Sequence, residues 1–192
     1  MADFVLVHGA WRGGWVWESV TKQLRKGGHS VFAPSLTGLA ERRHLLTSGV
    51  TLDTHVQDIV YLMEFEDLRN VVLCGHSAGG LVITGVADRI PERISSIVYL
   101  DAFVPKDGDS VFTLSSDAFK LFEITASAQL GGIACAPVPS AAFGMKEHMR
   151  EWFEKKCTPH PMACLLQGIK LSDRHLTIEK RMFRFSYVEY DI

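Results

Sequence analysis

The stretch that decides the fold is NVVLCGHSAGGLVITG, residues 70–85. An apolar, β-branched run leads into Gly-His-Ser-Ala-Gly at positions 75–79, and a second apolar run follows at once. A serine set among small residues at a sharp turn from strand to helix has its hydroxyl exposed at the carboxyl end of the strand. The pattern predicts Ser77 as a nucleophile and the Ala78 N–H, at the amino end of the next helix, as a donor to a developing anion. A glycine-rich turn with an incidental serine is the alternative interpretation.

Short apolar runs alternate with segments of helical period through the first half of the chain. This alternation indicates an α/β fold with a mainly parallel sheet covered by helices on both faces. The expected strands are residues 4–8, 30–34, 70–75 and 95–103. The expected helices are residues 17–26, 52–65 and 79–89.

The pattern changes after Pro105. Residues 106–170 show helical stretches at 117–130 and 146–156, Pro-rich breaks and no convincing strand, whereas RMFRFSYVEYDI at 181–192 is expected to form one more strand. The predicted division is therefore an α/β core at 1–105, a helical cap insertion lying over the sheet at 106–171, and a return to the core with its last strand at 172–192.

Composition narrows the functional classes. A chain of 192 residues is about one domain, and a net charge of −2 gives no electrostatic argument for nucleic acid or an anionic membrane. Four cysteines without a C-x-x-C pair or zinc-like spacing predict reduced thiols, a cytoplasmic location and no metal site. No leader is expected at the amino end, and no apolar run approaches the ~20 residues that span a bilayer.

A second motif is VLVHGAWRGGWVW, residues 5–17, in the loop after the first strand. This loop is expected to bring the Ala10 N–H beside that of Ala78, and two such donors form an oxyanion hole worth about 3 kcal/mol for each donor. His8 is expected to have a structural role in the turn. Trp11 and Trp15 either wall an apolar pocket or belong to the core.

Together with GHSAGG at 75–80, IVYLDAFVP at 97–105 and TPHPM at 158–162, this motif resembles the α/β-hydrolase fold. More narrowly, it is similar to the small esterases related to plant methyl-ester esterases and hydroxynitrile lyases, and the similarity runs in order through nearly the whole chain. The resemblance implies Ser77 as the nucleophile and the backbone N–H groups of Ala10 and Ala78 as the oxyanion hole. It also implies an apolar pocket under the cap and neither a metal nor an organic cofactor.

The same resemblance raises the question of the catalytic base, because the triad of this fold follows the order Ser, acid, His. The acid belongs just after the strand FRFSYVEYD at 183–191, near Asp191, and the histidine belongs after one further strand, beyond residue 192. His148, His160 and His175 are expected at the surface, although His160 matches a position that looks structural in the resembling family. His175 is a weaker candidate base and Asp101 a fallback acid.

Three outcomes stay open at this point: a C-terminally short form of a longer hydrolase, a hydrolase with a substituted base, or a non-catalytic homologue that binds a ligand. A chain without the last strand exposes a sheet edge, which favours pairing with a second copy. The predicted function is hydrolysis of small, fairly apolar carboxylic esters through an acyl-enzyme on Ser77. A hydroxynitrile lyase, using the same serine with a histidine and a cap lysine, is the second enzyme hypothesis.

Overall fold

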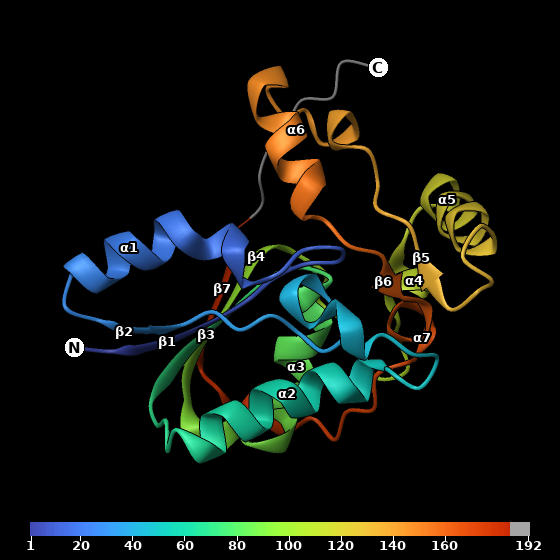
Figure 1. Cartoon of the computed structure of the whole chain (residues 1–192). Coiled ribbons are helices and arrows are strands. Elements are labelled where there is room, and N and C mark those ends of the chain that lie inside the picture. Colours follow the sequence, from blue (N-terminus) through green and yellow to red (C-terminus); the bar gives the residue numbers. More distant parts are fainter. Residues whose placement is uncertain (185–192) are drawn as a thin grey trace.

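The computed structural model describes residues 1–184, and its centre is a five-stranded sheet in the order β2-β1-β3-β4-β7 (Figure 1). All four neighbouring pairs of strands are parallel, which confirms the predicted parallel sheet. The expected strands of the first half are all present, and residues 185–192 of the last expected strand lie outside the described part of the chain. The strands are β1 (Asp3–Val7), β2 (Ser30–Phe32), β3 (Val71–Ser77), β4 (Ile94–Ala102) and β7 (Lys180–Arg184).

Helices cover both faces of this sheet, as predicted. Figure 1 shows α1 (Glu18–Lys26) above the sheet, and α2 (Leu52–Phe65) with α3 (Gly79–Arg89) below it. Every residue from Gly79 to Asp88 is buried, because α3 packs against the sheet on one side and α2 on the other. No helix within residues 1–184 combines the length and the apolar character needed to cross a membrane.

The segment 106–171 is mainly helical, and Figure 1 shows α5 and the short β5–β6 pair to the right of the sheet. Its helices are α4 (Val111–Leu114), α5 (Asp117–Ala128), α6 (Glu147–Lys156) and α7 (Met162–Leu166).

Two short antiparallel strands, β5 (Ala134–Cys135) and β6 (His160–Pro161), also occur in this segment, so the expectation that it holds no strand is wrong for these four residues. The division into core and cap stays a prediction. Five short 3-10 helices complete the described chain: η1 (Gly14–Trp17), η2 (Ala40–Leu45), η3 (Pro91–Arg93), η4 (Ser140–Phe143) and η5 (Arg174–Thr177).

The main core lies between the sheet and the α2–α3 layer. The helical period of α2 places Val56, Ile59 and Met63 on one face, and all three side chains are buried there. They meet β-branched and leucine side chains of the central strands, and burying each such side chain stabilises the fold by about 1.5–3 kcal/mol.

The junction of β3 with α3 is packed too closely for larger residues. A Cβ built on Gly80 would lie 2.0 Å from the carbonyl oxygen of Phe103, at the end of β4. A Cβ on Gly79 would lie 2.9 Å from the carbonyl oxygen of Val7, at the end of β1. The first turn of α3 is therefore held directly against the backbone of both neighbouring strands.

Replacing Gly80 with alanine tests this packing. Because the obstacle is backbone rather than a flexible side chain, Gly80→Ala is expected to lower the free energy of unfolding by at least about 1–3 kcal/mol. Urea denaturation followed by circular dichroism measures the change. Gly49→Ala is the matched control, since its Cβ would have no neighbour closer than 3.7 Å, and equal stability of the two variants would contradict the account.

Candidate active site

Ser77 occupies a sharp turn between β3 and α3. Its φ of 53° lies in the left-handed region, which costs an L-residue roughly 1–2 kcal/mol. The register of β3 against β4 shifts between His76 and Ser77, and the Phe103 N–H donates to the Ser77 carbonyl at 3.2 Å. The surrounding strands thus hold the serine in a conformation that it would not adopt alone, as expected for a strand-to-helix elbow.

The Ser77 cavity has a volume of about 290 Å³ and brings the predicted site residues together. Ser77, Ala10 and Ala78 all line it. A Cβ on Gly9 would lie 2.8 Å from the Ser77 Cβ, so the loop after β1 is seated directly against the elbow. The rest of the described wall comes from the β1 loop, the end of β4, α4, α5 and η4: Trp11, Arg12, Phe103, Val111, Leu114, Ser115, Ser116, Phe119 and Phe143.

The backbone donors of this cavity have the character of an oxyanion hole. Within residues 1–184, neither the Ala10 N–H nor the Ala78 N–H has a hydrogen-bond acceptor. The Ala78 N–H also lies at the amino end of α3, where the helix dipole favours a negative charge. Two unengaged donors beside a serine hydroxyl suit the tetrahedral oxyanion of acyl transfer.

His8 holds the loop after β1 in place. Its Nδ1–H donates to the Gly9 carbonyl at 2.8 Å, and its Nε2 accepts the Leu36 N–H at 3.1 Å. Burial lowers the pKa of His8 to about 3, against the raising effect of the Gly9 hydrogen bond, so the ring is neutral and can donate and accept at once. The structural role predicted for His8 agrees with these contacts.

The two tryptophans of the loop have different roles. Trp11 walls the cavity, and its Nε1–H donates to the Cys135 carbonyl of β5 at 3.0 Å. Trp15 does not line the Ser77 cavity and packs edge-on against Trp152 and Phe153 of α6. Trp11 therefore both walls the Ser77 cavity and belongs to the buried core. The half-buried Trp15 is not part of that core and lines a separate apolar pocket with Trp152 and Phe153.

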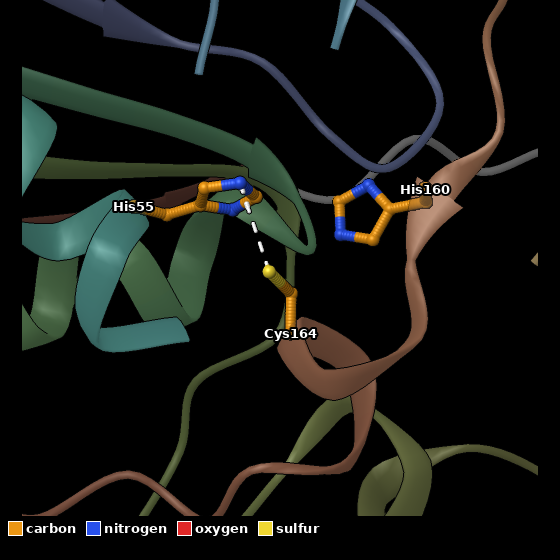
Figure 2. A group of neighbouring side chains, drawn as sticks. All are labelled: His55, His160 and Cys164. Carbon is orange, nitrogen blue, oxygen red and sulfur yellow. Dashed lines mark hydrogen bonds between the residues drawn. The ribbon is translucent and has the colours of Figure 1, made fainter. Parts of the chain in front are cut away.

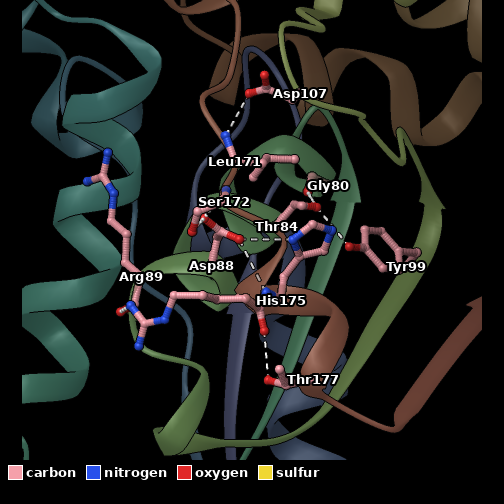
Figure 3. Close-up of polar contacts among 11 residues, drawn as sticks. Gly80, Thr84, Asp88, Arg89, Tyr99, Asp107, Leu171, Ser172, His175 and Thr177 are labelled. Atoms are coloured by element: carbon pink, nitrogen blue, oxygen red, sulfur yellow. Dashed lines mark hydrogen bonds and ion pairs between the residues drawn. The ribbon is translucent and has the colours of Figure 1, made fainter.

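Both predictions for His175 are wrong: it is neither a surface residue nor a recruited base. It is buried, and its Nδ1 lies 3.0 Å from the Asp88 Oδ1 at the far end of α3 (Figure 3). The separation of ten positions between Ala78 and Asp88 corresponds to roughly 15 Å of helix. His175 and Ser77 thus lie at opposite ends of α3.

The other candidate residues are His148, His160, Asp101 and Asp191. His148 is exposed on α6, as expected, whereas His160 is buried, which corrects its surface prediction. Asp101 is the next-to-last residue of β4 and has a φ of 46°, and its negative charge acts on Arg12 and His76. Its role as acid stays a prediction, and Asp191 lies outside the described residues. No histidine lines the Ser77 cavity within residues 1–184.

Sequence reasoning missed one cluster, formed by His55, His160 and Cys164 behind the elbow. Their ligand atoms lie within 4.8 Å of one another, and Figure 2 shows the three side chains converging from α2 and from the β6–α7 segment. His55 and Cys164 are 109 positions apart, so no local spacing signals the group.

The hydrogen bonds of this cluster do not fit a metal ion. The His55 Nε2–H donates to the Thr37 carbonyl at 2.9 Å, and the His160 Nδ1 accepts the Trp11 N–H at 3.3 Å, which leaves the proton on Nε2. Burial raises the pKa of the Cys164 thiol, so it stays protonated. A metal would have to displace these protons and break both hydrogen bonds, and the cluster is better described as a neutral, hydrogen-bonded part of the core.

Comparison with known proteins identifies the protein family to which this fold and this cavity belong. The sequence profile of the Alpha/beta hydrolase family matches residues 4–176, and the chain belongs to this family. The resemblance and the fold class inferred from the sequence are thereby confirmed.

Individual relatives agree with the family assignment. The chain is 42% identical over 193 residues to a carbendazim hydrolyzing esterase of Nocardioides sp. (strain SG-4G), covering 95% of this chain and 79% of that protein. It is 34% identical over 108 residues to methylesterase 8 of Arabidopsis thaliana, covering 56% of this chain but only 40% of the relative. Among solved structures, an extracellular alpha/beta-hydrolase from a Paenibacillus species aligns with a TM-score of 0.84 and 27% identity, covering 95% of this chain and 76% of that one.

Asp88 provides a test of the network around His175. Burial alone would raise the pKa of Asp88, but hydrogen bonds from His175 and Ser172 outweigh it and lower the pKa to about 2. The ionised carboxylate therefore stabilises the fold above its unfolded pKa of about 4, and this contribution is lost as the pH falls from about 4 towards 2.

Asp88→Asn is expected to lower the free energy of unfolding by about 2 kcal/mol at pH 7, with the difference from wild type shrinking below pH 4. Urea unfolding at several pH values measures this. Asp53→Asn, which removes an exposed ion pair with Arg89, is the control and should change stability by less than about 1 kcal/mol. If Asp88→Asn lowers the free energy of unfolding by the same amount at every pH, the charge-based explanation is ruled out.

Proposed function

We propose that this protein hydrolyses carboxylic esters, with Ser77 as the nucleophile. One observation carries the proposal: the strained Ser77 shares a largely apolar cavity with the N–H groups of Ala10 and Ala78, which have no acceptor within residues 1–184. The named esterases among the relatives support ester hydrolysis as the reaction class.

The reaction proceeds in two steps. The Ser77 Oγ attacks the ester carbonyl carbon while its proton passes to a general base, and the tetrahedral oxyanion accepts hydrogen bonds from Ala10 and Ala78. Collapse expels the alcohol and leaves an acyl-serine. The base gives the first proton to the departing alcohol. Water then attacks the acyl carbon while the base takes a proton from it, and that proton passes to the Ser77 oxygen as the acid is released. The family resemblance implies a histidine as the base, and His175 is excluded by its position at the far end of α3.

The cavity limits the substrate. Its volume of about 290 Å³ lies at the small end of the range for small-molecule sites, which is about 300–1,000 Å³. Trp11, Phe103 and Phe119 make most of the wall apolar and aromatic, which suits a small ester with an apolar body. The hydroxynitrile lyase hypothesis requires a lysine from the cap, and no lysine lines the described wall of the cavity.

The cellular location and the binding partners of the protein are further parts of the proposal. Four free cysteines suit a reducing compartment, so we propose a cytoplasmic location. A net charge of −2 favours neither nucleic acid nor an anionic membrane as a partner. β7 is one of the two edge strands of the sheet within residues 1–184, and all five of its residues are exposed, which supports a homo-oligomer formed through this sheet edge.

Ser77→Ala tests the nucleophile. Turnover of p-nitrophenyl acetate and butyrate is expected to fall by at least about 10³-fold, because only the oxyanion hole and binding would remain. A fluorophosphonate should label wild-type protein and fail to label Ser77→Ala, as seen by intact mass. Ser19→Ala, an exposed position on α1, is the control and should leave both readouts unchanged. Labelling of Ser77→Ala to the wild-type extent would exclude Ser77 as the reactive serine.

A further inference from the structure

Arg12 is the single charged side chain on the described wall of the Ser77 cavity. It follows Ala10 by two residues, so it projects from the same loop that supplies an oxyanion donor. Attack on an ester carbonyl needs a nucleophile, a base and oxyanion donors, but no permanent cation in the binding cavity. The presence of Arg12 in a largely apolar wall therefore requires a separate explanation.

The guanidinium of Arg12 is fixed from several sides. Its Nη1 donates to the His76 Nδ1 at 2.9 Å. Its central carbon lies 5.2 Å from the ring centroid of Phe143 and 5.3 Å from that of Phe153, both in cation–π range. A guanidinium held in this way loses little rotamer freedom when it binds a ligand.

These contacts leave much of the hydrogen-bonding capacity of Arg12 unused. All its hydrogen bonds to residues 1–184 come from Nη1, which leaves the Nε and Nη2 donors for a ligand. His76 cannot neutralise the cation, because an imidazole is either neutral or positively charged. Burial and the charge of Arg12 lower its pKa to about 4, so the ring is neutral and accepts the hydrogen bond from Arg12. The negative charge of Asp101 reaches Arg12, but no ion pair joins Arg12 to a carboxylate in the described chain.

We propose that Arg12 binds a carboxylate carried by the substrate, so that the preferred esters hold a second, ionised carboxyl group joined by a short linker to the scissile ester. This inference rests on the proposed ester hydrolysis at Ser77 and names its substrate class. The planar guanidinium matches a carboxylate through two parallel hydrogen bonds, and the apolar walls strengthen the attraction between opposite charges. With the ester carbonyl at the Ala10 and Ala78 donors, the carboxylate reaches Arg12 from within the same cavity.

Two matched pairs of esters test the proposal. In the first pair, the acyl part ends in a carboxylate (monomethyl glutarate) or in a neutral group of similar shape (methyl 5-methylhexanoate). In the second, the alcohol part carries the difference (4-acetoxybenzoate against 4-isopropylphenyl acetate). Rates of methanol or phenol release give kcat/KM for wild type, Arg12→Met, Arg12→Lys and Lys22→Met. The last variant removes one exposed positive charge away from the cavity.

Wild type and Lys22→Met are expected to prefer the carboxylate ester of at least one pair, and the pair that shows the preference locates the carboxylate on the acyl or the alcohol side. Arg12→Met is expected to lower kcat/KM for that ester by about 10-fold or more, mainly through KM, and to leave its neutral partner unchanged. Arg12→Lys should retain part of the preference. The proposal is overturned if Arg12→Met lowers kcat/KM equally for both esters of a pair, or if wild type prefers neither carboxylate ester to its neutral partner.

A binding experiment separates this inference from the proposed hydrolysis. In the Ser77→Ala background, isothermal titration with 4-acetoxybenzoate and with 4-isopropylphenyl acetate measures affinity without turnover. Tighter binding of the carboxylate, lost when Arg12→Met is added, supports the Arg12 site even if wild type hydrolyses neither ester. Equal affinities for the two ligands overturn the Arg12 site even if hydrolysis at Ser77 is established.

Discussion

The structure depends on the close approach of backbones around Ser77. The elbow has a left-handed residue between β3 and α3, and the loop after β1 and the end of β4 press on it from both sides. Since Gly9 and Gly79 present no side chain there, the donors of Ala10 and Ala78 reach the same cavity as the serine hydroxyl. The strain at Ser77 persists because the packing around it leaves no room for relaxation.

Neutral imidazoles connect this elbow to the segment that covers it. His8, His55 and His160 are buried, and burial lowers the pKa of each, so each ring carries one donor and one acceptor. They satisfy backbone groups that would otherwise be buried without partners, including the Leu36 N–H and the Thr37 carbonyl. Through the bond from the Trp11 N–H to His160, the position of β6 is coupled to the loop that carries Ala10.

Local patterns predicted the sheet, the helices α2, α3, α5 and α6, and the association of Ser77 with Ala10 and Ala78, because strand alternation, helical period and turn chemistry depend on neighbouring residues. The β5–β6 pair escaped prediction because two-residue strands carry no periodicity. The contacts of His175 with Asp88 and of Cys164 with His55 escaped it because their partners are 87 and 109 positions apart. A histidine in a polar sequence context was assigned to the surface, yet a single buried carboxylate is enough to hold it inside.

The helix α3 links the site to the edge of the sheet. Its amino end presents the Ala78 donor, while Asp88 near its carboxyl end accepts hydrogen bonds from Ser172 and His175, which precede β7. Because α3 is buried from Gly79 to Asp88 and pressed against backbone at its first turn, it can neither slide nor rotate independently of the strands. The contact at Asp88 therefore fixes where the chain re-enters the sheet beside β4, and the other end of β4 leads into Phe103 on the wall of the Ser77 cavity. The order of the strands and the shape of the cavity thus follow from the placement of one buried helix.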